Sequence, residues 1–397
     1  MPCLYCKAKH RSEECPVNAR SRSLLNIKKT LTALKSPIFS GASPAPFIGQ
    51  YNYPNINVGI LAPPFITQEA WQYDAPKHWV SSQYAIPKIV DLRASLIQSK
   101  TTSNVRESTK IVELAQLIGM ADKPVDVEIA LTKIPNFSLN IDTNHAPMGP
   151  SGIIKKAEIT SNPSIPTRID KVVSDHDLLA NNAITELYSK GISEYQLSKL
   201  LSVGVLGKQR KLVPTKWSIT ATDDLIGKHL HQKILEYSQT EHQAFFGNYL
   251  GNYYLILFLK GNWSYELFEI ALPGTYDLMG GISTDYEEIL GRKSYAENCG
   301  GGYYTVRLAI LEKLAELKKQ TRALVFRFIT PEYTIPLGVW VTKESARNTL
   351  QTKPITFTTK ELILTYAKHL IKRKFGYDIT TLIKQSKILR ERQQNLL

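Results

Sequence analysis

Cysteine is scarce in this chain: four cysteines occur among 397 residues, and three of the four lie within the first fifteen positions. So few thiols exclude a fold that depends on a disulfide framework. The N-terminal cluster has the spacing Cys-x2-Cys-x3-His-x4-Cys, and four such donors can converge on one tetrahedral zinc ion. We therefore predict a knuckle-like module over residues 1–20 that holds structural Zn²⁺ through Cys3, Cys6, His10 and Cys15.

Two kinds of zinc module fit this cluster. Lys7, Lys9 and Arg11 are interleaved with the ligands, which is typical of a knuckle that contacts nucleic acid. A purely structural zinc staple explains the same ligands equally well. Incidental cysteines in a frayed N-terminus are a weaker explanation, because cysteine is so rare elsewhere. Disulfide pairing is also weaker, because three is an odd number and Cys299 lies far away.

Long apolar runs and a signal peptide are also missing. The longest apolar stretch, Tyr253–Leu259, has the length of a strand and is far too short to cross a bilayer. No apolar segment follows the cysteine cluster in the way that a secretion signal requires. We therefore expect a cytoplasmic protein with no membrane partner.

Acidic residues are outnumbered by basic ones. Lys and Arg total 49 against 35 Asp and Glu, which gives a formal net charge of +14. An excess of this size attracts polyanions, so DNA is the first partner to consider. The hydrophobic content of 43% is ample for ordinary folded cores.

Strand and helix patterns alternate without a regular repeat, which predicts an α+β fold of mixed sheets and helices. A hairpin or extended loop is predicted over 47–61, where apolar and polar residues alternate up to a Pro-Asn turn. Strand-like runs cover 125–131, 253–259, 266–271, 324–329 and 338–341. Helical periodicity covers 108–120, 184–206, 225–241, 304–319 and 360–374. A glycine-rich stretch at 273–302 predicts a division into a large domain, 21–280, and a smaller one, 281–397.

The segment Ala183–Leu201 has the pattern of a helix-turn-helix, with Gly191-Ile192 at the turn. Its second helix offers Ser, Gln, Tyr and Glu, and Lys199 is its one basic residue. That composition suits the major groove poorly, so we favour a plain pair of core helices.

The polar stretch that follows, 208–224, combines cations with an aromatic ring. Four cations here could follow a phosphate backbone, while the indole of Trp217 could stack on a base. The predicted nucleic-acid-binding residues are therefore Lys208, Arg210, Lys211, Lys216 and Trp217.

Several carboxylates are candidates for a second metal site or an active site. Asp223 and Asp224 precede the predicted helix at 225–241, where capping of that helix is the simpler role. A set of carboxylates beside a basic strip could instead hold Mg²⁺ or Mn²⁺ for phosphodiester hydrolysis. The candidates for such a site are Asp91, Asp126, Glu128, Asp223 and Asp224.

Distinctive motifs are spread along the chain, in the segments 47–59, 91–93, 147–152, 211–221, 291–296, 301–304 and 331–340. Together they resemble the motifs of the archaeal Nre family of DNA-repair proteins. The resemblance covers nearly the whole chain. It implies a cytosolic archaeal factor with an N-terminal metal-binding cluster, a large N-terminal domain and a smaller C-terminal domain.

The resemblance also implies a link to the sliding clamp through a C-terminal motif, Gln-x-x-aliphatic-x-x-aromatic-aromatic. This chain departs from it: Gln385 and Ile388 match, but Glu391 and Arg392 replace the two aromatic residues. Our leading hypothesis is a DNA-repair factor that binds DNA through a basic surface. The alternatives are a metal-dependent nuclease, or other nucleic-acid-processing enzyme, and an adaptor that bridges proteins.

Overall fold

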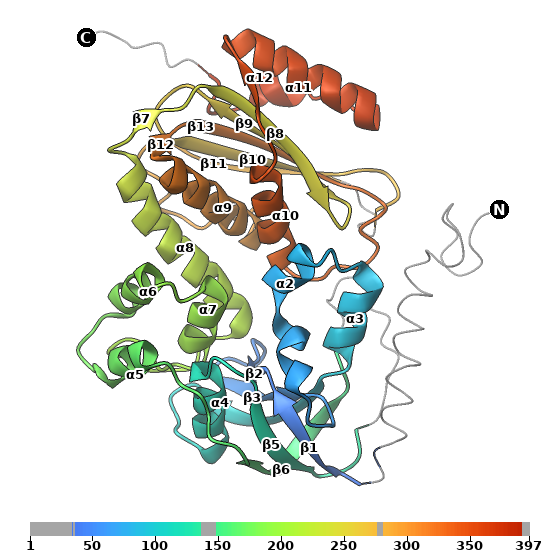
Figure 1. Cartoon of the computed structure of the whole chain (residues 1–397), viewed down its shortest axis with the longest axis vertical. Coiled ribbons are helices and arrows are strands. Elements are labelled where there is room, and N and C mark those ends of the chain that lie inside the picture. The colour runs from blue at the N-terminus through green and yellow to red at the C-terminus, as the bar shows by residue number, and fades with distance from the viewer. Residues whose placement is uncertain (1–33, 35, 136–147, 276–280, 391–397) are drawn as a thin grey trace, which may run out of the picture. The chain divides into compact units, whose positions relative to one another are not determined.

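The computed structural model describes residues 34, 36–135, 148–275 and 281–390 (Figure 1). They form two compact units: the first contains the described residues up to Ile226 together with 335–337, and the second contains the other described residues from Gly227 onward. The predicted mixture of sheets and helices is confirmed, whereas the predicted zinc module lies outside the described residues. Within the described ranges, no helix has both the length and the apolar character needed to cross a membrane.

Unit 1 is built on a six-stranded sheet in the order β1-β5-β6-β4-β3-β2. Its strands are β1 (Ile38–Ser43), β2 (Ala45–Ile48), β3 (Asn55–Ala62), β4 (Ile97–Asn104), β5 (Val125–Leu131) and β6 (Ser151–Ile159). Its helices are the 3₁₀ helix η2 (Gln68–Asp74), α2 (Pro76–Ser81), α3 (Ile86–Ala94), α4 (Lys110–Met120), α5 (Thr167–Ser174), α6 (Ala180–Ser189) and α7 (Glu194–Ser202). The core forms where Val127 and Ile129 of β5 pack with Leu114 and Ile118 of α4.

Unit 2 contains a second six-stranded sheet, in the order β11-β10-β13-β9-β8-β14. Its strands are β8 (His242–Tyr249), β9 (Asn252–Leu259), β10 (Ser264–Ala271), β11 (Ile282–Glu287), β13 (Arg322–Ile329) and β14 (Ile355–Phe357). A two-stranded sheet joins β7 (Ser238–Gln239) to β12 (Lys319–Gln320). The helices of this unit are α9 (Gly301–Leu317), α10 (Trp340–Leu350), α11 (Lys360–Phe375) and α12 (Thr380–Gln385).

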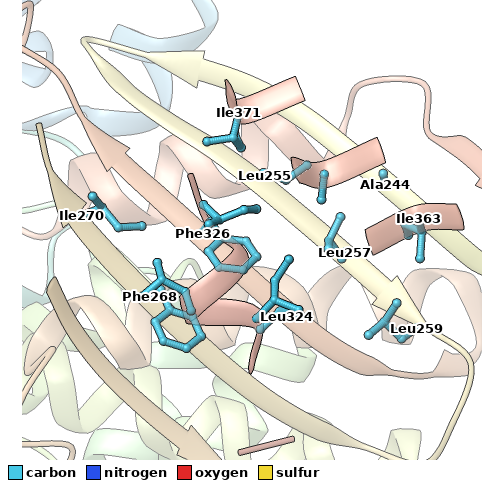
Figure 2. Close-up of a cluster of buried hydrophobic side chains, with 14 of the residues drawn as sticks. Ala244, Leu255, Leu257, Leu259, Phe268, Ile270, Leu324, Phe326, Ile363 and Ile371 are labelled. Carbon is cyan, nitrogen blue, oxygen red and sulfur yellow. The ribbon is translucent and has the colours of Figure 1, made fainter. Parts of the chain in front are cut away.

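Helix α11 covers one face of this sheet. Ile363 and Ile371 of α11 are fully buried in one cluster with Leu257 of β9 and Phe326 of β13. Figure 2 shows these side chains converging from the helix and from neighbouring strands. Burial of such aliphatic and aromatic surface is the main force that holds helix and sheet together.

Most of the predicted elements are confirmed. The strand at 125–131 has the bounds that we predicted, and β2 and β3 form the predicted hairpin. The helical stretch predicted over 184–206 is divided into α6 and α7 by Gly191, whose φ of +81° favours glycine. The predicted pair of helices with its turn at Gly191-Ile192 is therefore confirmed.

Two predictions were wrong in type or position. The predicted strand at 338–341 is instead the approach to α10 and its first residues: Gly338 has a φ of +101°, outside the β region, and the helix begins at Trp340. The predicted helix 225–241 overlaps α8, which spans Thr215–Ile234, but its last residues lie outside the helix and include strand β7. Pro214 directly precedes the first residue of this helix, and its carbonyl accepts hydrogen bonds from the Trp217 and Ser218 amides.

The predicted domain division near residue 281 is based on the glycine-rich stretch at 273–302. The sheet of unit 2 takes strands from both sides of this position, with β8, β9 and β10 before it and β11, β13 and β14 after it. The limit between the two compact units instead falls within α8, between Ile226 and Gly227.

Candidate nucleic-acid interface

Of the predicted nucleic-acid-binding residues, Lys216 and Trp217 lie in the first turn of α8. Lys208, Arg210 and Lys211 lie in the connection between α7 and α8 in unit 1, named here the basic strip. Its backbone is fixed at two points: the Leu212 amide donates to the Val105 carbonyl at 2.8 Å, and the Val213 amide donates to the Ser202 carbonyl at 2.9 Å. The Leu212 side chain is buried, which anchors the segment further. The strip is therefore a fixed connection that holds its neighbouring side chains at the surface.

Close backbone approach explains the glycine that precedes this strip. Gly204 has a φ of +71°, and a Cβ atom there would lie 2.5 Å from the Lys211 carbonyl oxygen. Any other residue would both strain the backbone and push the strip away from α7. Gly204 thus positions Lys211.

Lys208, Lys211 and Lys216 are exposed. Among the residues that the structure describes, none of the three has a carboxylate within ion-pair distance, although ion pairs occur elsewhere in unit 1. Their positive charge is therefore not neutralised by a described side chain. Such cations are suited to contact with an external polyanion.

Arg210 is placed differently from the three lysines. Its guanidinium donates to the backbone carbonyls of Gly207, Val173 and Asp175, and the residue is half-buried. These bonds connect the strip to the end of α5. Arg210 is thus a positioning residue whose donors are used inside unit 1.

Trp217 lies in the first turn of α8 and packs against Tyr53 of the β2–β3 turn. Their ring centroids are 5.5 Å apart with an interplanar angle of 43°. Both side chains remain accessible, with Trp217 exposed by 47% and Tyr53 by 45%, and the nearby Tyr51 is exposed by 64%. Tyr53 is a residue that the sequence analysis missed. The tyrosines at the tip of the predicted hairpin were the signal that could have found it.

Backbone hydrogen bonds connect the ring pair to the basic strip. The Val105 amide donates to the Pro54 carbonyl at 3.0 Å, and the Val105 carbonyl accepts from the Leu212 amide at 2.8 Å. The segment after β4 therefore runs between the β2–β3 turn and the strip. This segment also carries Arg106, an exposed cation that sequence reasoning overlooked.

A small cleft of about 150 Å³ opens beside these segments. Its polar lining comprises Arg106, Glu107, Ser108, Gln116, Arg210 and Lys211, and its apolar lining comprises Val105, Val112, Val203 and Leu212, with Gly204. Three cations against one carboxylate make the cleft positively charged. The Glu107 carboxylate accepts a hydrogen bond from the Asn104 amide at 3.3 Å.

The carboxylates predicted for a second site lie on three different elements of the structure. Asp126 and Glu128 lie on β5, and Asp91 lies on α3. Asp223 and Asp224 lie in the interior of α8, so the predicted capping role is wrong, because that helix begins at Thr215. Within the described part of the chain, no group of three or more His, Cys, Asp or Glu side chains could hold a metal ion.

Helix α7 is a core helix, and its side chains are not arranged for contact with the major groove of DNA. Leu197 and Leu200 are fully buried. The side-chain Nε2 of Gln196 donates to the Gly119 carbonyl at 2.7 Å, and the Lys199 ammonium pairs with the Asp74 carboxylate at 2.8 Å. Because its polar side chains are engaged within unit 1, α7 serves the fold.

The remaining predicted sites fall outside this surface. Cys3, Cys6, His10 and Cys15 lie outside the described residues. In the clamp-like segment, Ile388 is buried in the core of unit 2, and the Glu266 carboxylate accepts from Ser386 Oγ and from the Lys387 and Ile388 amides. The aliphatic residue of that segment thus packs inside its own chain.

Cys299, the cysteine remote from the N-terminal cluster, is half-buried in unit 2. Burial raises the pKa of its thiol to about 12, with the Glu269 carboxylate contributing in the same direction. A thiol with such a pKa is protonated at neutral pH and is a poor nucleophile. Its backbone amide donates to Asp285 at 2.8 Å, which points to a structural role.

The fold and surface together define an α+β protein with two six-stranded sheets, a two-stranded sheet, and a basic and aromatic surface on one of its units. The family models "Archaeal Nre, N-terminal" and "Archaeal Nre, C-terminal" match residues 10–276 and 287–397. The chain therefore belongs to the archaeal Nre family.

Three curated relatives support this assignment. DNA repair protein NreB of Archaeoglobus fulgidus is 32% identical over 100% of this chain and 99% of its own length. DNA repair protein NreA of the same organism is 34% identical over 94% of each chain, and NreA of Haloferax volcanii is 33% identical over 79% of this chain and 78% of its own. No solved structure matches the chain.

Proposed function

We propose that this protein is a cytoplasmic DNA-repair factor that binds DNA through a basic–aromatic surface, defined as Tyr53, Arg106, Lys208, Lys211, Lys216 and Trp217. Two findings support the proposal. The relatives that cover nearly the whole chain are named DNA repair proteins. The lysines of the surface carry charge that no described carboxylate neutralises.

The unneutralised lysines are the observation that carries the proposal. A lysine held in an internal ion pair must give up its partner before it can contact a phosphate, whereas an exposed, unpaired lysine need not. Each phosphate contact then releases condensed counterions, which makes binding strongly dependent on salt. Arg210 contributes by holding the strip in place.

A nuclease reaction is not favoured. Phosphodiester hydrolysis through metal ions needs several carboxylates close together, and the described residues hold no such group. The proposed function is therefore DNA binding without cleavage. The protein would contact the phosphates and bases of the lesion or DNA structure that it binds.

Fluorescence anisotropy of a labelled oligonucleotide over a series of salt concentrations tests the proposal. We expect the triple variant Lys208→Gln, Lys211→Gln, Lys216→Gln to reduce the slope of log affinity against log salt by about 2 to 3, since each phosphate contact contributes about 0.7 to 0.9. The wild-type protein should bind with the steeper slope.

The control is a second triple variant with the same change in net charge. Lys260→Gln, Lys293→Gln and Lys353→Gln remove three exposed cations from unit 2. We expect this variant to keep the wild-type slope. Equal slopes for both triple variants would show that total charge, and not the basic–aromatic surface, governs binding.

A further inference from the structure

We propose that the basic–aromatic surface binds single-stranded DNA, with an unpaired base stacked on the Trp217–Tyr53 ring pair and an adjacent phosphate held in the cleft by Arg106 and Lys211. This inference rests on the proposed function and names the class of DNA that the surface selects. In a duplex, neighbouring base pairs cover the faces of each base, so an interior base cannot stack on a side chain. The ring pair therefore discriminates between unpaired and paired strands.

The exposure of the two rings is the first support. Trp217 and Tyr53 keep 47% and 45% of their surface accessible although they contact each other. Stacking of a base would remove this apolar surface from water, and aromatic side chains stack on every type of base. The site thus fits a strand of any sequence.

The ordered backbone that carries the ring pair is the second support. The backbone of Trp217 is held in the first turn of α8, where its amide donates to the Pro214 carbonyl at 2.8 Å. Tyr53 lies in a turn closed by the Asn55 amide and the Asn52 carbonyl at 2.8 Å, and Asn52 adopts a φ of +62° that asparagine tolerates. A site fixed before binding loses little conformational entropy when a base docks.

The position of the cleft is the third support. Pro54, Val105 and Leu212 are joined by consecutive backbone hydrogen bonds, so the turn that carries Tyr53 is connected to the segments that line the cleft. Arg106 and Lys211 line the cleft, and no described carboxylate lies within ion-pair distance of either side chain. A phosphate next to the stacked base meets these two cations.

Anisotropy with three labelled probes tests the inference: a single strand, the same strand with abasic sites, and the matching duplex. We expect Trp217→Ala to weaken single-strand binding roughly tenfold or more, because one base stack is lost. Binding of the abasic strand and of the duplex should change little. Trp217→Phe keeps a ring and should retain most of the affinity, while Arg106→Gln should weaken single-strand and abasic binding alike.

The matched control is Trp71→Ala, which removes another exposed indole from unit 1, in η2. Its affinities should equal those of the wild type. If Trp217→Ala and the wild type bind the single strand equally while the lysine variant loses salt dependence, stacking is refuted and the proposed DNA binding stands. If the wild type binds none of the probes, both proposals fail. Tyr53→Ala gives the same readout should the Trp217 variants not fold.

Discussion

Two ion pairs of unit 2 are largely removed from solvent and hydrogen-bonded. The Glu287 carboxylate accepts from Arg307 Nε at 2.7 Å and from Trp263 Nε1 at 2.8 Å, and the side chains of Glu287 and Arg307 are exposed by 1% and 3%. A second pair joins Arg327 to Glu269, with Asn252 accepting from the same guanidinium. A buried charge is tolerated when its partner and its hydrogen bonds are in place.

Removal of one member of such a pair leaves the other charge buried without compensation. We expect Glu287→Ala to lower the free energy of unfolding by about 3 to 5 kcal/mol. Chemical denaturation followed by circular dichroism measures the change. The control is Glu186→Ala, which breaks the exposed Lys190–Glu186 pair and should cost about 1 kcal/mol or less. Equal losses in the two variants would contradict the argument.

Three elements of unit 1 meet at one carboxylate. Asp74 at the end of η2 pairs with Arg93 of α3 at 2.9 Å and with Lys199 of α7 at 2.8 Å. Burial alone would raise the pKa of Asp74, but the attraction of Lys199 and Arg93 outweighs it and lowers the pKa below its usual value of 3.8. Asp74 is therefore a carboxylate that connects secondary-structure elements.

The sign of the pKa shift fixes a pH dependence. Because the folded state lowers the pKa of Asp74, its contribution to stability is full above pH 3.8 and is lost as the pH falls through the lowered value. We expect Asp74→Asn to lower the free energy of unfolding by about 1.5 to 3 kcal/mol at pH 7. Denaturation at a series of pH values should show this difference shrinking below pH 3.8. A difference independent of pH would rule out the charge as its source.

The proposed zinc module at residues 1–20 is an element whose folding would depend on a metal ion, because so short a segment has no core of its own. We expect the purified protein to carry a single zinc ion and Cys6→Ser to lose it. Elemental analysis of both proteins measures the metal content. Cys299→Ser is the control and should keep its zinc, because Cys299 contacts Ser283 and Asp285 in unit 2. A Cys6→Ser variant with the same zinc content as the wild-type protein would contradict the proposed zinc site.

On the scale of the whole molecule, net charge and binding surface are separate properties. The formal charge of +14 describes the chain, but many of its cations are neutralised within the fold. Arginines that use their guanidinium groups in internal ion pairs include Arg93, Arg307, Arg327 and Arg347. The planar guanidinium suits such buried pairs better than the ammonium of lysine. The charge available to a polyanion is thus better judged from the unpaired lysines than from the total.

The sequence by itself determined the elements that carry continuous apolar patterns. The strand Val125–Leu131 alternates with a period of two, the strands near 253–259 and 324–329 are short continuous apolar runs, and the helix near 360–374 has a period of 3.6 residues. Motifs along the whole length likewise indicated the family. These signals are local, so one sequence is sufficient to read them.

Tertiary structure alone decided which distant residues meet. Tyr53 lies beside Trp217, and the Arg210 guanidinium reaches the Val173 carbonyl, across separations that no local pattern encodes. The sequence at the start of α8 has only a weak helical periodicity. The helix nevertheless begins at Thr215, because the connection before it is held by the hydrogen bond from the Leu212 amide to the Val105 carbonyl. The predicted carboxylates lie on α3, β5 and α8, and packing of the cores, not side-chain type, decides where each of these elements lies.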